Sequence, residues 1–172
     1  MGDPLEKIGP AKGSFEEILM QIPGFKGYLR AEYRRDADRL QRQHLGQELK
    51  RARQTLDKVK QDLAQKLAFT HITRLETLTD KIYRVASRIE NADEGYSGFF
   101  DSVKVGEKEL ALIYEVDKDL LSDVSLVAQA ASKLSPSLPD AGMDEAITQV
   151  DQTIEALDRK FDRRKDLLKG TL

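Results

Sequence analysis

The chain has 172 residues, of which 40% are hydrophobic and 34% are charged, with a formal net charge of −2 and neither Cys nor Trp. This length suits one domain with its own core, the composition is typical of a soluble helical bundle, and the lack of Cys excludes disulfides and cysteine-based sites. No apolar run reaches the roughly 18 residues of a membrane-spanning helix and the N-terminus does not resemble a signal peptide, so we expect a cytoplasmic protein.

Residues 1–13 combine Pro and Gly with no periodic apolar pattern, which predicts a loose N-terminal arm. Ser14 and Glu17 form a capping-box pattern that predicts a short helix over residues 14–22. The sequence Ile22-Pro23-Gly24 ends this helix. Its apolar side is predicted to pack on the next helix, with a membrane surface as the alternative.

The longest predicted helix covers residues 28–67, where apolar residues recur at steps of three and four. The exception is the step of five between Leu40 and Leu45, which we interpret as a phase slip near His44 and Gly46, where the helix changes partners. The first half also carries a candidate basic strip: Arg30, Arg34, Arg35, Arg39 and Arg42. Because acidic residues interleave with these arginines, a solvated or internally paired face is favoured over a nucleic-acid site.

A second helix is predicted over residues 70–92, with Thr70 as its N-cap and His71 on the surface. An antiparallel hairpin with the preceding helix brings Ala92 level with His44 and Gly46. The first half of the long helix then needs cover from another part of the chain.

The stretch Asn91–Asp101 interrupts the helical pattern, because it carries two glycines and three aromatic rings. The rings are predicted to pack on the long helix where Gly46 leaves room, or to form a patch that a partner helix enters. The candidate interaction patch therefore consists of Tyr96, Phe99, Phe100, His44 and Gly46.

Two further helices are predicted, over residues 107–134 and 143–169, with a Ser/Pro-rich loop between them. The last helix has the cleanest heptad spacing, and Arg164 and Leu168 continue its register. The predicted fold is all-α: residues 14–172 form one elongated antiparallel bundle of four long helices plus a short N-terminal helix, with coiled-coil-like packing.

The sequence shows none of the usual catalytic patterns: no phosphate-cradling Gly-rich loop, no dinucleotide fingerprint and no zincin motif. Neither His44 nor His71 follows a Glu by three residues, which argues against a di-iron bundle. We therefore expect a protein that is not an enzyme and has no catalytic residues, metal or cofactor. A phosphotransfer bundle using His44 is a third reading, below the two considered next.

The run Ile22-Pro23-Gly24-Phe25-Lys26-Gly27-Tyr28 and the run Gly95-Tyr96-Ser97-Gly98-Phe99-Phe100-Asp101 resemble motifs of a group of uncharacterised bacterial all-helical proteins. The resemblance extends over most of the chain and implies no established activity, ligand or site residue. The sequence thus predicts a module for protein–protein interaction or self-assembly. Its expected surfaces are the seam of residues 143–169, the uncovered first half of residues 28–67, and the aromatic stretch. A peripheral membrane-surface protein is the alternative.

Overall fold

The computed structural model describes residues 34–92 and 107–169, with side chains from 38 to 92 and from 112 to 167. These ranges form four helices packed against one another and contain no strand, which confirms the predicted all-α class. The helices are α2 (Arg34–Gln65), α3 (Ile72–Glu90), α5 (Glu107–Ser132) and α6 (Asp140–Lys169). The predicted arm, the helix over residues 14–22 and the aromatic rings lie outside the described residues.

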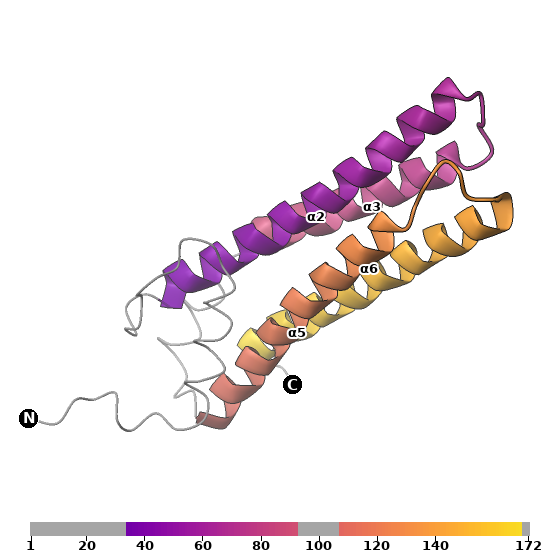
Figure 1. Ribbon diagram of the computed structural model, residues 1–172. Coiled ribbons are helices and arrows are strands. Elements are labelled where there is room, and N and C mark those ends of the chain that lie inside the picture. The colour runs from indigo at the N-terminus through magenta and orange to yellow at the C-terminus, as the bar shows by residue number, and fades with distance from the viewer. Residues whose placement is uncertain (1–33, 93–106, 170–172) are drawn as a thin grey trace, which may run out of the picture.

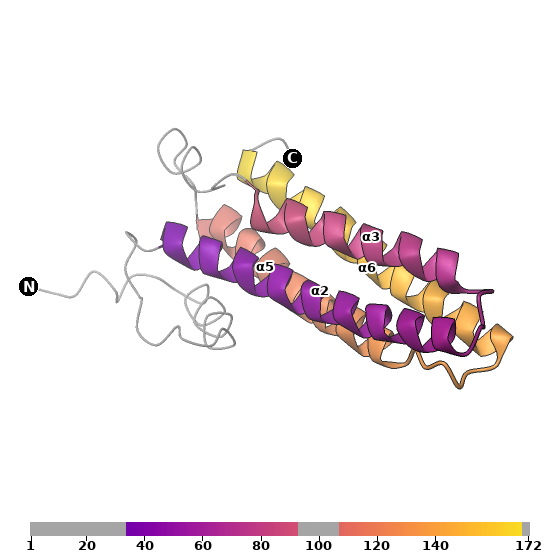
Figure 2. The same ribbon diagram turned by 90° about the horizontal axis from the view of Figure 1, so that it is seen from above.

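The four helices form two hairpins, α2 with α3 and α5 with α6, whose turns lie at the same end of the molecule (Figure 1). Helix α2 also packs beside α5, and α3 beside α6 (Figure 2). Helices are antiparallel within a hairpin and parallel between hairpins. The parallel direction follows from three pairs of residues separated by a constant 70 positions: Arg74–Asp144, Lys81–Asp151 and Arg88–Asp158.

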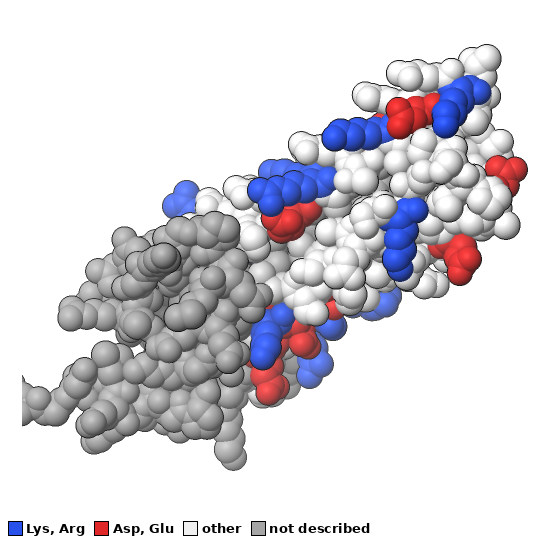
Figure 3. All heavy atoms as spheres, in the orientation of Figure 1, with Lys and Arg blue, Asp and Glu red and all other residues white. Residues whose placement is uncertain are grey.

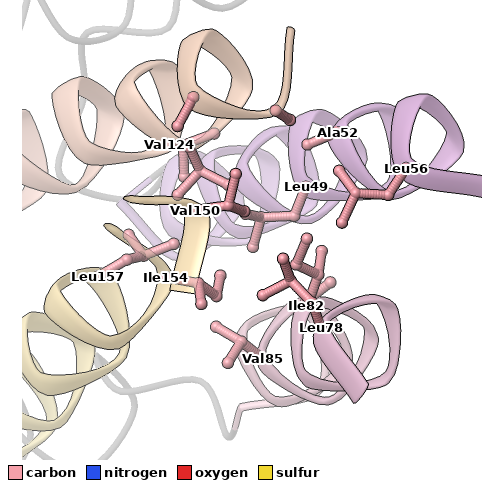
Figure 4. Packing of buried hydrophobic residues seen from close by; sticks show 14 of the residues in the cluster. Leu49, Ala52, Leu56, Leu78, Ile82, Val85, Val124, Val150, Ile154 and Leu157 are labelled. Carbon is pink, nitrogen blue, oxygen red and sulfur yellow. The ribbon is translucent and has the colours of Figure 1, made fainter. Parts of the chain in front are cut away.

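The core is a set of apolar seams with steps of three and four, the spacing of a coiled coil. Figure 4 shows these residues converging from all four helices. In α6 the predicted heptad positions from Met143 to Phe161 are all buried, so this part of the seam holds the bundle together and is no free surface. The buried seam residues are Leu45, Leu49, Ala52, Leu56, Val59 and Leu63 in α2; Leu75, Leu78, Ile82, Val85 and Ile89 in α3; Ile113, Leu120, Val124, Val127 and Ala131 in α5; and Met143, Ile147, Val150, Ile154, Leu157 and Phe161 in α6.

The turn between α2 and α3 differs from the prediction at both helix ends. Helix α2 ends at Gln65, and Leu67 follows in the left-handed conformation with φ of 56°. The Ala68 N–H donates to Leu63 O at 2.9 Å and the Leu67 N–H donates to Ala64 O at 3.0 Å, which is a Schellman motif. Glycine is the usual residue at this position, and without it the sequence predicted the turn but not the residue at which the helix ends.

The N-cap of α3 is His71, without a side-chain capping bond, and the prediction of Thr70 as the cap is wrong. The prediction that His71 lies on the surface is also wrong, because its exposed fraction is 6%. Helix α6 begins at Asp140, three residues before the predicted start. A carboxylate in the first turn is favourable, because it faces the free N–H groups and the positive end of the helix dipole.

Candidate functional site

The heptad seam of α2 continues toward its N-terminus through two charged residues. Arg42 precedes Leu45 by three positions, and Asp38 precedes Arg42 by four. Both side chains are buried, whereas Leu40 is 38% exposed. The predicted phase slip is therefore wrong: the seam keeps its register and changes from apolar to charged.

Charged residues occupy the matching seam positions of α5 and α6. Arg164 Nη2 donates to Asp38 Oδ1 at 2.5 Å, and Arg164 Nε donates to Asp117 Oδ1 at 2.5 Å. Arg42 Nε donates to Asp38 Oδ2 at 3.0 Å. All four residues are at most 5% exposed. We call Asp38, Arg42, Asp117 and Arg164 the charged layer. Its two guanidinium and two carboxylate groups balance, which is the condition under which burying such groups is tolerated.

The charged layer reaches all four helices. Arg42 Nη1 donates to the carbonyl oxygen of Glu90 at 3.3 Å and to that of Ala92. These carbonyls lie at the C-terminal end of α3, where helix carbonyls lack partners within the helix. Gln41 Nε2 donates to Asp117 O of α5 at 3.3 Å. The described start of the α2 seam, from Asp38 to Arg42, is thus covered by α5 and α6. Ala92 lies level with Arg42, close to the predicted height.

The charged layer changes the acidity of one of its carboxyl groups. Burial raises the pKa of Asp117, and the neighbouring Asp38 carboxylate acts in the same direction, against the opposing Arg164 guanidinium. The native state thus holds the proton of Asp117 more tightly than the unfolded chain does.

A second polar feature borders the charged layer at Arg42, between α2 and the end of α3. It is an open depression of about 750 Å³, and its lining includes Arg39, Arg42, Lys50 and Glu90. Lys50 Nζ lies 2.7 Å from both carboxylate oxygens of Glu90. A Cβ atom added at Gly46 would overlap the Glu90 side chain. The room that the sequence indicated at Gly46 thus holds a glutamate of α3.

The predicted site residues divide among three environments. His44 is half-buried and Gly46 is buried, both on α2, while Tyr96, Phe99 and Phe100 lie outside the described residues. In the basic strip, Arg42 points into the bundle and Arg39 is exposed. Arg34 and Arg35 belong to α2, with side chains outside the described set, and Arg30 lies outside the described residues altogether. The two groups of candidates thus do not form one described site.

Helices α3 and α6 are joined along their length by opposite charges that sequence reasoning missed. Arg74, Lys81 and Arg88 occupy one heptad position of α3 and donate to acidic residues of α6. Lys81 Nζ lies 2.5 Å from Asp151 Oδ1 and 2.7 Å from Glu155 Oε1. We call these pairs the α3–α6 ladder: Arg74 with Asp144, Lys81 with Asp151 and Glu155, and Arg88 with Asp158 and Asp162. Basic residues at intervals of seven in one helix, and acidic residues at intervals of seven in another, were the available signal.

The ladder shifts two pKa values. Burial acts to lower the pKa of Lys81, but hydrogen bonds and charge attraction from Asp151 and Glu155 outweigh it and raise the pKa. The hydrogen bond and the charge of Lys81 lower the pKa of Glu155. Both shifts favour the charged forms. On the face seen in Figure 3, basic and acidic side chains of the described helices lie in mixed groups.

His71 extends the contact between the hairpins to the end that carries the turns. Its Nε2 lies 3.1 Å from Asp140 Oδ1 and its Nδ1 lies 3.2 Å from Asp144 Oδ1. Carboxylates only accept hydrogen bonds, so a ring protonated on both nitrogens satisfies both contacts. The two hairpins are thus joined by polar contacts from one end of the bundle to the other.

No family model, curated protein or solved structure that we compared with the chain matches it. Within residues 34–92 and 107–169, no helix combines the length and apolar character needed to cross a membrane. The same residues contain no group of three or more His, Cys, Asp or Glu side chains that could hold a metal ion. The candidate functional site consists of the charged layer and the α3–α6 ladder.

Proposed function

We propose that the protein is a non-enzymatic interaction module that works by charge-specified helix pairing, with a protein partner or with itself. The observation that supports this most is the charged layer, which places four ionisable side chains at heptad positions where apolar residues pack better. A buried ion pair adds little stability compared with apolar residues of similar volume. Polar residues in a heptad seam are best known for fixing register and partner choice.

The position of the charges supports the same proposal. Arg164 of α6 contacts Asp38 of α2 and Asp117 of α5, and the α3–α6 ladder joins α3 to α6. The charged contacts therefore extend across the boundary between the two hairpins. Charges at the edges of a coiled-coil seam set orientation and partner choice more than affinity. Such a pattern suits a protein whose task is to select which helices pair.

The experiment is affinity capture from the native host with the immobilised full-length chain, combined with sedimentation of the purified protein over a range of concentrations. We expect a defined set of partners or a defined oligomer. The Arg164→Met variant is expected to lose these partners or this oligomer. The Arg163→Met variant, changed at an exposed neighbouring position, is expected to keep them. A chain that stays monomeric at every concentration and captures no protein would overturn the proposal.

A further inference from the structure

We infer that the surface which each hairpin presents to the other is also the binding surface for a second copy of this chain, so that two copies exchange hairpins. In the exchanged dimer, the α2–α3 hairpin of one copy packs on the α5–α6 hairpin of the other, and each of the two bundles keeps every contact described above. The inference rests on the proposed function and specifies its partner and surface.

The connectivity of the helices permits the exchange. The start of α2, the end of α3, the start of α5 and the end of α6 all lie at one end of the bundle, opposite the two turns (Figures 1 and 2). The hairpins are therefore joined at one end only, through the chain between Glu90 and Glu107. A hairpin can leave its partner as a unit without changing its own antiparallel pairing.

A separated hairpin needs a replacement partner. The side chains of Leu49 and Leu56 in α2 and of Ile82 in α3 are fully buried in the closed bundle. Two helices alone leave one side of these seams in contact with water, at about 25 cal/mol for each Å² of apolar surface. The α5–α6 hairpin covers these side chains in the closed bundle, and the α5–α6 hairpin of a second copy offers the same surface.

The charges make this recognition specific to a copy of the chain. The basic side chains of the ladder lie on α3 and their acidic partners lie on α6, so each hairpin carries only one half of the pattern. Asp38 lies on the first hairpin, and Arg164 with Asp117 on the second. Either hairpin therefore recognises the complementary hairpin from any copy equally well, and concentration decides between the closed monomer and the exchanged dimer.

Two charge-reversed chains test the exchange. The first carries Lys81→Glu and Arg88→Glu on α3. The second carries Asp151→Lys, Glu155→Lys, Asp158→Lys and Asp162→Lys on α6, so that every acidic partner of the two α3 residues is reversed. Each chain alone sets like charges against each other in its own bundle and in its own exchanged dimer. When the two are unfolded together and refolded as a mixture, the exchanged heterodimer contains two bundles with matched charges. The control chain carries all six substitutions and has a matched ladder without any partner.

We expect the refolded mixture to yield a 1:1 species of twice the 19.4 kDa chain mass, with a higher melting temperature than either variant alone. We expect the control chain to melt near the wild type. Because the chain has no native Cys, Arg74→Cys in the first variant and Asp144→Cys in the second allow a short thiol-specific crosslinker to report the contact between α3 and α6. Crosslinking between the two chains is expected in the mixture only.

A mixture that remains two separate monomers with the low melting temperatures of the single variants would overturn the exchange. So would a heterodimer in which α3 of one chain is not crosslinked to α6 of the other, since the chains then meet by another surface. If these results appear while the wild type still captures partners, the exchange fails and the proposed function stands. If the wild type captures no partner and does not self-associate, both the exchange and the proposed function fail.

Discussion

Replacing Arg164 with Met removes the cation that bridges two buried carboxylates and keeps most of the side-chain volume. Arg164 is 4% exposed, and it donates to Asp38 Oδ1 and Asp117 Oδ1 at 2.5 Å each. Without it, one guanidinium, that of Arg42, remains in the charged layer for two carboxylates. Removing one partner of a buried ion pair costs about 3–5 kcal/mol, because the remaining charge stays buried without compensation.

We therefore expect Arg164→Met to lower the free energy of unfolding by about 3–5 kcal/mol, or the melting temperature by roughly 6–20 °C for a chain of this size. Urea denaturation followed by circular dichroism measures the change. The control is Arg163→Met, whose exposed position predicts a change of within about 0.5 kcal/mol. If Arg164→Met costs no more than this control, the layer is not a set of mutually dependent buried charges and the reasoning fails.

Three other substitutions test local features of the fold. Leu67→Gly is expected to stabilise the protein by about 0.5–1 kcal/mol in urea denaturation, because Leu67 is 75% exposed and holds a left-handed conformation that favours glycine. Gly46→Ala is expected to raise the free energy of unfolding by about 1 kcal/mol in a Glu90→Ala background, because alanine favours the helix more than glycine does. The gain should be smaller in the wild type, where the added methyl group displaces the Glu90 side chain from Lys50. Equal effects in both backgrounds would contradict the contact between position 46 and Glu90. Because the pKa of Asp117 is raised in the folded state, ionisation of this side chain opposes folding. The stability of the wild type relative to Asp117→Asn should therefore fall as pH rises from about 4 through the raised pKa. A constant difference between the two pH–stability curves would refute this.

The apolar seams were accessible from the sequence, because their spacing depends only on the geometry of the helix. Residues 143–169 show steps of three and four from Met143 to Phe161, and the structure buries all of these positions. The level of Ala92, predicted beside His44 and Gly46 and found beside Arg42, followed from helix lengths within a few residues. Features that depend on one element at a time were thus predictable.

The charged layer was not predicted, although Arg164 was placed in register, because the seam of residues 28–67 was sought among apolar residues only. Leu40 was preferred to Arg42 as the next seam residue, which produced a step of five where the structure has none. Asp38 and Arg42 continue the spacing of α2, yet the sequence of one helix gives no sign that Arg164 lies opposite. Buried charges can be placed at a seam only when the partners from the other helices are known.

The parallel pairing between hairpins is a second feature that single helices do not show. Arg74, Lys81 and Arg88 could equally be a solvated face, until α6 is found beside them with acidic residues at the same interval. The end of α2 was predicted two residues too late for a local reason, because no glycine marks the turn at Leu67. The charged pairs thus depend on tertiary context, whereas the turn depends on local sequence.

The central claim, that the charged layer specifies helix pairing more than it stabilises the fold, is tested most directly by replacing the whole layer. The variant combines Asp38→Leu, Arg42→Leu, Asp117→Leu and Arg164→Leu, and urea denaturation is paired with native mass spectrometry. The account predicts a free energy of unfolding equal to that of the wild type or higher by about 1–4 kcal/mol, together with a mixture of oligomers in place of a defined state. A large loss of stability with an unchanged oligomeric state would contradict it.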